Sequence, residues 1–243
     1  MKFPAALPHG DINEVFDDIF FVTGTMRNEF FGSTWQFSRN MTIVRENNKL
    51  TLINSVRLDE AGLAKLDALG DVVNVVRLGD MHGLDDQFYL DRYKATHWGL
   101  PKMGVAESSS IATSITKTLE VDGEMPFSDC SVFIFESSNR PESILRLDRH
   151  GGIMIACDAM QNWVEPDEYF DDETIGKMRE MGFFTPAGVG PAWVHVCEPQ
   201  PEDFVRLSKV PFNHALCGHG TPVKNSAQSE FAKTFNQMFG VAV

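Results

Sequence analysis

The sequence predicts an α/β fold in which two β-sheets pack face to face and helices cover their outer sides. Two groups of strand-like segments, each with its own hairpin, are separated by a helix and followed by further helices. The 243 residues, 43% of them hydrophobic, suffice for one large domain or two small ones. No linker rich in Pro, Gly or Ser divides the chain, so we predict a single domain over residues 1–243.

The first half contains a hairpin and then a strand–helix–strand unit. Strand-like runs cover residues 18–23, 35–46 and 49–54, and Asn47-Asn48 forms the turn between the last two. Leucines at helical spacing predict a helix over residues 59–69, with Asp59 at its start and Gly70 at its end. The apolar run 72–78 has the composition of a buried strand, and strand–helix–strand units place ligands at strand ends.

The second half repeats this organisation with more helices. The predicted strands cover residues 115–121, 131–136, 143–147, 152–157 and 212–217. The predicted helices cover residues 171–181, 201–207 and 225–239, and the last has an apolar stripe that indicates a core-facing surface. Residues 106–114 are small and polar and predict a loop, and Gly188-Val-Gly190-Pro predicts a turn with no helix behind it.

Charge and cysteine content exclude some classes of partner. With 21 basic and 34 acidic residues, the net charge of −13 disfavours broad binding to nucleic acid or to anionic membranes. No apolar run approaches 18 residues, so no membrane span is predicted, and the acidic N-terminus does not resemble a secretory signal. The four cysteines are widely spaced, which predicts reduced, buried thiols and a cytoplasmic protein.

Three polar segments follow predicted strands and contain residues that bind metals. They are His82-Gly-Leu-Asp-Asp86 after the strand 72–78, Asp158 after the strand 152–157, and Gly218-His219-Gly220 after the strand 212–217. Strand ends can meet at one edge of a layered fold, and converging His and Asp side chains are typical of transition-metal sites.

In order and content, these segments resemble the metallo-β-lactamase-fold hydrolases, over roughly residues 20–239. The family's signature loop, His-x-His-x-Asp-His, is matched by residues 82–87, with His82 and Asp86 kept and Leu84 and Gln87 in place of histidines. Asp158 matches the metal-bridging aspartate and His219 the last histidine. The resemblance implies a four-layer αββα sandwich with a metal site at one edge, between the sheets.

The resemblance also implies that one of the family's two metal positions is lost. The first position keeps only His82 beside the shared Asp158, because Leu84 replaces one histidine and the segment 136–142 does not contain the other. The second keeps Asp86, Asp158 and His219, and Gln87 offers a carbonyl oxygen as a further ligand. The expected cofactor is at most one divalent ion of zinc, iron or manganese, with His82 as an orienting or general acid–base group.

Structural interpretations of the same residues remain open. His82 can be an ordinary loop residue, Asp85 and Asp86 can cap a helix beginning near Leu84, and Asp158 can bind backbone amides. The glycines beside His219 can serve turn geometry alone. The other five histidines are assigned structural or exposed roles.

Two functional hypotheses follow. The first is a divergent single-metal hydrolase that uses an activated water on a small-molecule substrate. The second is a catalytically silent relative that binds a small molecule or a protein. No serine-hydrolase elbow, phosphate-binding loop or dinucleotide-binding motif competes with them. The motifs specify neither a substrate nor an oligomeric state.

Overall fold

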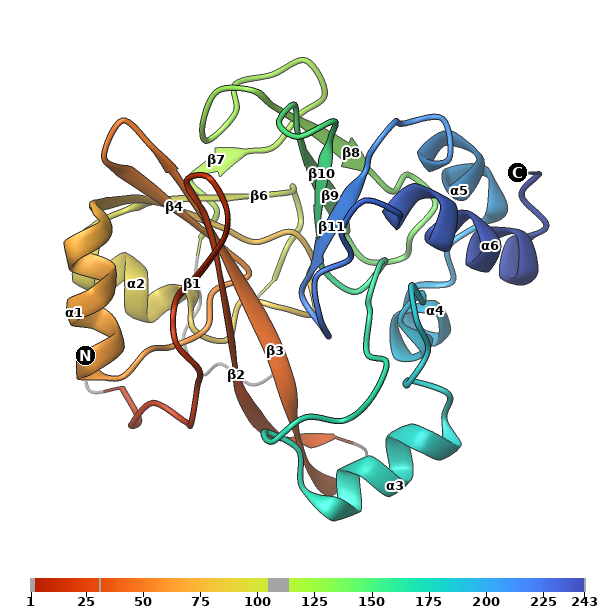
Figure 1. The fold of residues 1–243 in the computed structure, drawn as a ribbon, viewed down its shortest axis with the longest axis horizontal. Helices are drawn as coiled ribbons and strands as arrows, with labels where there is room; N and C mark the ends of the chain where they lie inside the picture. The colour runs from red at the N-terminus through yellow and green to blue at the C-terminus, as the bar shows by residue number, and fades with distance from the viewer. Residues whose placement is uncertain (1–2, 31, 105–113, 243) are drawn as a thin grey trace.

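The protein is built from two β-sheets that face each other, with helices on both outer sides (Figure 1). This computed structural model describes residues 3–30, 32–104 and 114–242. The predicted four-layer αββα sandwich is confirmed. Within these ranges, no helix combines the length and apolar character needed to cross a membrane.

The first sheet has its strands side by side in the order in which they occur along the chain. They are β1 (Asn13–Phe16), β2 (Ile19–Phe30), β3 (Ser33–Glu46), β4 (Lys49–Ile53), β5 (Asp71–Val76), β6 (Thr96–Gly99) and β7 (Lys117–Thr118). The pairs from β1 to β4 are antiparallel, and those from β4 to β7 are parallel. The hairpin of β2 and β3 extends well beyond the rest of the sheet (Figure 1).

The second sheet has the order β11-β10-β9-β8. Its strands are β8 (Cys130–Ile134), β9 (Ser143–Leu147), β10 (Ile153–Ala156) and β11 (His214–Cys217). Strands β10 and β11 are parallel, and their register pairs Ala156 with Cys217. Because parallel strands end at the same edge of a sheet, the residues that follow these two strands emerge side by side.

The helices complete the outer layers (Figure 1). They are α1 (Glu60–Leu69), α2 (Asp86–Tyr93), α3 (Asp172–Glu180), α4 (Pro191–Cys197), α5 (Pro201–Leu207) and α6 (Ala227–Phe239). Helices α1 and α2 lie on the outside of the seven-stranded sheet, and α4 to α6 on the outside of the four-stranded sheet. Helix α3 lies beside the extended β2–β3 hairpin, where the Thr174 hydroxyl accepts a hydrogen bond from the Gln36 N–H.

The layers explain why strand β10 is apolar without alternation. Ile153 and Ile155 pack in the core between the two sheets, whereas Met154 and Ala156 pack against the helices of the outer layer. A strand covered on both faces has no solvated side, so a continuous apolar run is expected. All four cysteines are free thiols, as predicted, and only Cys130 is not fully buried.

The structure differs from the sequence-based prediction in two places. The prediction of a turn without a helix at residues 188–190 is wrong, because α4 begins directly at Pro191. Proline at the first helical position needs no hydrogen-bond donor and favours helix initiation. Strand β6 was not predicted, and helix α2 corresponds to the open alternative of a helix that begins near Leu84. The loop predicted over residues 106–114 lies almost entirely outside the described residues.

Gly220 provides a test of how tightly the connection after β11 is packed. It has φ +82°, and a Cβ there would lie 2.0 Å from the backbone carbonyl of Asn162. Gly182 has a similar φ of +77° and nothing within 4 Å. We expect Gly182→Ala to lower the free energy of unfolding by about 1 kcal/mol through strain alone. Gly220→Ala should lower it by a further ~2 kcal/mol or more in urea denaturation, and equal losses would contradict this packing.

Candidate metal centre

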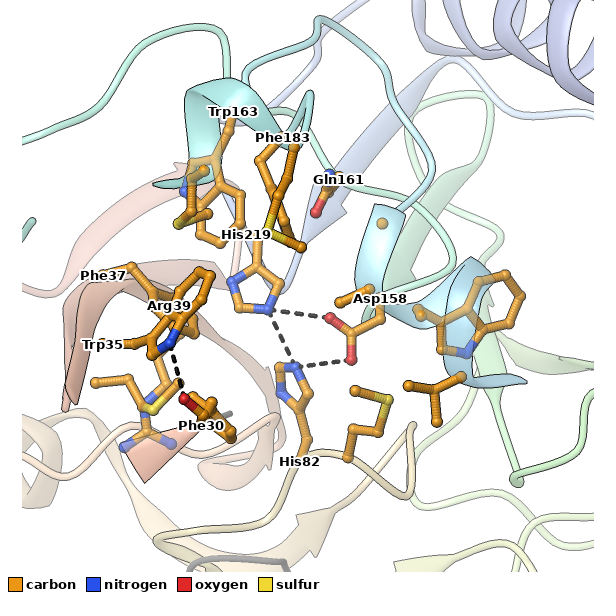
Figure 2. A pocket seen from close by; sticks show the side chains of 18 of the residues that line it. Phe30, Trp35, Phe37, Arg39, His82, Asp158, Gln161, Trp163, Phe183 and His219 are labelled. Carbon is orange, nitrogen blue, oxygen red and sulfur yellow. Dashed lines mark hydrogen bonds and ion pairs between the residues drawn. The ribbon is translucent and has the colours of Figure 1, made fainter. Parts of the chain in front are cut away.

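Three side chains from distant parts of the chain converge at the edge of the sandwich (Figure 2). His82 Nε2 lies 3.4 Å from Asp158 Oδ2 and 3.2 Å from His219 Nε2. His219 Nε2 lies 3.2 Å from Asp158 Oδ1. All three side chains are at most 14% exposed, so bulk water does little to screen the polar atoms that face one another.

The second sheet positions two of these residues. Asp158 and His219 each lie two residues beyond the last register pair of β10 and β11, Ala156 and Cys217. The Asn40 amide holds the segment around His219 from β3, because its Nδ2 donates to the carbonyl oxygens of Cys217 and Gly220. His82 approaches from the loop between β5 and α2, in a turn closed by its own N–H and the Gly79 carbonyl.

A hydrogen bond to the backbone determines the tautomer of His219. Its Nδ1 lies 3.1 Å from the carbonyl oxygen of Ser38, which can only accept. Nδ1 therefore carries a hydrogen, and in the neutral ring Nε2 presents its lone pair to His82 and Asp158. Burial lowers the pKa of His219, which favours this neutral form. A backbone carbonyl that orients an imidazole in this way is common around metal-binding histidines.

A second buried carboxyl supports Asp158 from behind. The N–H groups of Asp158 and Ala159 both donate to Glu142 Oε1, at 2.9 and 3.0 Å. Burial, together with the charge of Asp158, raises the pKa of Glu142 well above its ordinary value. Burial also disfavours the charged form of Asp158. The positive charge of His82 and the hydrogen bonds with the two histidines outweigh this effect, so the pKa of Asp158 lies below its usual range.

The donor set requires a cation. A carboxylate and two imidazole nitrogens face one another within 3.4 Å, and at least one of those nitrogens, His219 Nε2, is held as an acceptor. Facing lone pairs repel unless a proton or a metal ion lies between them. The arrangement therefore suits either protonated histidine or a bound metal ion.

The structure does not bring all the predicted ligands together. Asp158 and His219 are adjacent, and they are joined by His82, for which the sequence predicted an orienting or acid–base role. Among the described residues, the group of His, Cys, Asp and Glu side chains that could hold an ion does not contain Asp86. Gln87 lies on α2 and donates a hydrogen bond to Asp91 one turn further along.

Asp86 is directed away from this group by a buried ion pair. Its carboxylate lies 2.9 Å from Arg77 Nε and 2.6 Å from the Ser55 hydroxyl, with His97 Nε2 at 3.3 Å. Both Arg77 and Asp86 have almost no exposed surface. A buried guanidinium needs a carboxylate partner, and Asp86 is that partner here. The ligand set that the geometry offers is therefore His82, Asp158 and His219.

The helix-capping interpretation applies in part to the neighbouring aspartate. Asp85 occupies the cap position of α2, but its side chain makes no capping hydrogen bond. Its carboxylate instead pairs with Arg39 and accepts a hydrogen bond from the Arg57 N–H. The two adjacent aspartates thus neutralise Arg39, in β3, and Arg77, just beyond β5.

Some functional residues had a weak signal in the sequence and others had none. Arg77 is a charged residue at the end of an apolar strand, which indicates a buried partner. Glu142 and Ser38 had no such signal, because their roles depend on contacts across the sandwich. Gly83 has φ +100°, and a Cβ there would lie 2.0 Å from Arg77 Nε, so the glycine makes room for the guanidinium.

A cavity of about 360 Å³ opens beside the three converging residues. Leu84 and Arg140 line it, and they occupy the regions where the family pattern places further histidines. The remaining wall is rich in aromatic residues and methionines, including Phe30, Trp35, Phe37, Trp163, Phe183, Met26, Met81, Met178 and Met181 (Figure 2). A cavity of this size accommodates a small organic molecule.

Comparisons with known proteins identify the fold. No family model and no curated protein matches the chain. Solved metallo-β-lactamases do match. The DIM-1 enzyme gives a TM-score of 0.62 at 13% identity, covering 95% of this chain and 98% of that chain. The enzyme from Hirschia baltica gives 0.59 at 10% identity, with 93% and 97% covered. FIM-1 from Pseudomonas aeruginosa, in its mono-zinc form, gives 0.58 at 12% identity, with 96% and 97% covered.

These matches establish the metallo-β-lactamase fold over almost the whole chain and confirm the resemblance drawn from the sequence. Sequence identities as low as these support a conclusion about the fold alone. The chemistry must therefore be argued from the residues of this chain.

The Arg77–Asp86 pair can be tested through stability. Arg77→Met leaves a buried carboxylate without its partner and should lower the free energy of unfolding by about 3–5 kcal/mol. The double variant Arg77→Met/Asp86→Leu removes both charges and should recover most of that loss. Urea denaturation of the wild type and both variants provides the measurement. Equal losses in the single and double variants would show that the two charges do not depend on each other.

The same pair predicts a pH dependence. Burial would raise the pKa of Asp86, but the His97 hydrogen bond and the Arg77 charge outweigh it, and the pKa is lowered. A carboxyl with a lowered folded-state pKa stabilises the fold fully above its unfolded pKa of about 4, and this contribution is lost as the pH falls. Between pH 6 and pH 3, the wild type should therefore lose stability more steeply than the double variant. Parallel pH profiles would contradict this.

Proposed function

We propose that the protein is a single-metal hydrolase that acts on a small molecule, with one divalent ion held by His82, Asp158 and His219. The observation that carries this proposal is the convergence of one ligand atom from each of these three residues, all within 4.8 Å of one another. The metallo-β-lactamase fold of the neighbours supports it, and one of them is described as a mono-zinc form.

The residues fit a metal ion by distance. Ligands bound tetrahedrally at about 2.0–2.1 Å lie roughly 3.3–3.4 Å from one another. The nitrogen–nitrogen distance of 3.2 Å is of this size, and so are the two nitrogen–oxygen distances of 3.2 and 3.4 Å, each to a different oxygen of Asp158. Two imidazoles and one carboxylate suit zinc and iron well, and manganese is the third candidate. A bound ion would lower the pKa of a water molecule and polarise a substrate oxygen.

The residues of the chain supply the remaining requirements of such a site. The Ser38 carbonyl keeps the His219 lone pair directed at the centre, and the Glu142 carboxyl fixes the backbone of Asp158. The aromatic wall of the cavity limits the access of bulk water, which strengthens electrostatic interactions inside. His82 serves in this arrangement as a ligand.

A catalytically silent binding protein is the second candidate. It is favoured by the replacement of histidine by Leu84 and by the position of Arg140, where the family pattern has a further histidine. In that case the cavity is the functional feature, and His82 and His219 are held by Asp158 through a proton. The metal content of the purified protein distinguishes the two candidates.

The first prediction concerns metal content. Protein purified without a histidine tag and supplied with zinc, iron or manganese should bind at most one tightly held ion per chain, measured by elemental analysis. Asp158→Asn and His219→Gln should each lower the metal affinity at least ~10-fold, because each removes one of three ligands. Asp86→Asn is the matched control and should keep its metal in whatever fraction remains folded.

Two ions per chain in the wild type would contradict the single site. Loss of metal from folded Asp86→Asn, as well as from Asp158→Asn and His219→Gln, would show that the ligands are those expected from the family pattern. A folded wild type that takes up no ion would leave the binding protein as the better assignment.

The second prediction concerns activity. We expect little or no β-lactamase or two-metal phosphodiesterase activity, because such chemistry commonly uses two ions to activate water and stabilise the leaving group. Any hydrolysis found in a substrate panel should fall by about 100-fold or more in Asp158→Asn and be abolished by chelation. Turnover that survives both treatments would contradict a metal mechanism.

A further inference from the structure

We propose that the cavity takes an uncharged molecule with an apolar group on each side of the polar atom that it presents to His82, Asp158 and His219. The inference rests on the proposed function only in making such a molecule the substrate. An ester of an aromatic acid and an apolar alcohol is an example. Water adds to its carbonyl carbon, the bond to the alkoxy oxygen breaks, that oxygen takes up a proton, and the acid and the alcohol are released. Binding of the molecule itself requires no metal.

One apolar wall of the cavity comes from the hairpin of β2 and β3. Met26, Phe30 and Phe37 line the cavity, and all three side chains are only partly buried. Phe30 and Phe37 pack against a buried aromatic cluster that includes Trp35, so they are supported from behind. Figure 2 shows Phe30, Trp35 and Phe37 together on one side of the converging histidines. Because the three lining side chains keep accessible surface, a ligand can cover apolar area on them.

A second apolar wall lies on the Asp158 side of the centre. Val196, on α4, and Met81, which directly precedes His82, line the cavity and are also only partly buried. Both pack against a separate cluster of buried residues in the outer helical layer. The N–H of Gly190, at the start of α4, donates to the Asp158 carbonyl oxygen at 3.0 Å and so fixes this helix beside Asp158. In Figure 2, Asp158 lies on the side of the histidines away from the hairpin residues.

The polar surface between the two walls is small. The side chains of His82, Asp158 and His219 are 10%, 14% and 7% exposed. A ligand can therefore bring only a few polar atoms to this centre, while the rest of its surface meets apolar side chains. Methionine side chains on both walls adapt to different shapes, which suits bulky apolar groups.

The charges of the cavity do not favour an ionic ligand. Arg39 pairs with Asp85, and Arg140 Nη1 lies 4.0 Å from Asp80 Oδ2. Asp158, the acidic residue on the described cavity wall, is engaged by both histidines. A charged ligand would lose its hydration in an apolar cavity whose own charges already have partners, and that loss opposes binding. The net charge of −13 gives no long-range attraction to anions.

The experiment compares three benzophenones of nearly equal size by equilibrium dialysis at neutral pH. 4-Ethylbenzophenone is uncharged, 4-benzoylbenzoate is an anion, and 4-(aminomethyl)benzophenone is a cation. Each has a carbonyl oxygen between two aromatic rings and no bond that hydrolysis could break. We expect the uncharged ketone to bind about 10-fold more tightly than either ion. The protein is measured as purified and after chelation, and the chelated protein is decisive because no ion at its centre attracts the carboxylate.

Variants on the two walls test whether both apolar sides take part. Met26→Gln and Val196→Thr keep the approximate shape of each side chain but make its end polar, and each should weaken binding of 4-ethylbenzophenone about 3-fold. Val194→Thr is the matched control, because Val194 is also partly buried on α4 and does not line the cavity. Met238→Gln, on α6, is the control for the methionine. Both controls should leave binding unchanged.

Equal or tighter binding of either ion by the chelated wild type would overturn the proposal, even if a variant fails to fold. Absence of binding of the uncharged ketone would also overturn it. Loss of affinity in only one of the two folded wall variants would contradict an apolar group on each side. Failure of the metal proposal has a different signature, since the preference for the uncharged ketone then persists while elemental analysis finds no ion.

Discussion

The parallel pairing of β10 with β11 is the constraint on which the candidate site depends. Its register places Ala156 opposite Cys217, so the two residues that follow each strand end leave the sheet together. Asp158 and His219 therefore meet at 3.2 Å although 61 positions separate them in the sequence. Both strands are buried on both faces, so a slip of register would move their side chains between two packed layers of different shape. The core thus fixes the geometry of the site.

The approach of His82 depends on a second buried interaction, the pair of Arg77 and Asp86. Arg77 stands just beyond β5 and Asp86 begins α2, so the pair closes the loop that carries His82. The Arg77 guanidinium also donates to the carbonyl of Gly104 and lies against Gly83. Because the Asp86 carboxylate already neutralises the buried Arg77 guanidinium, it is not available as a ligand for a metal ion. This explains how a loop that keeps both His82 and Asp86 of the family pattern directs only His82 toward Asp158 and His219.

The fold was largely predictable from the sequence because its signals are local or periodic. Helix α1 begins after Asp59, whose side chain accepts from the Gly62 N–H, and it ends at Gly70, as the capping residues indicated. Strand β9 and helix α5 have their predicted bounds. Helix α4 was missed because a seven-residue helix after Gly-Pro has too short a periodic pattern to outweigh its turn residues.

The site was predictable only in part, because a motif specifies positions in the chain and not the partners of each side chain. Asp158 and His219 follow strands that were visible in the sequence, and both reach the centre. Asp86 was equally plausible by motif, but its orientation is decided by Arg77, Ser55 and His97, which come from three other segments. Glu142 and Ser38 had no signal at all, since their contacts with Asp158 and His219 are properties of the packed structure.

At the candidate metal centre, the stability of the folded chain is coupled to the binding of a cation. Burying Asp158 beside Glu142 brings two carboxyl groups into a region of low polarity, which disfavours the charge on both. Hydrogen bonds from the two histidines offset this cost for Asp158, and a divalent ion in the same place would offset it more fully without requiring either ring to be charged. An ion that binds only the folded chain stabilises it in proportion to the logarithm of its concentration. Burial of the Asp158 carboxylate disfavours folding of the chain without a cation. The same buried carboxylate would make the binding of a cation favourable.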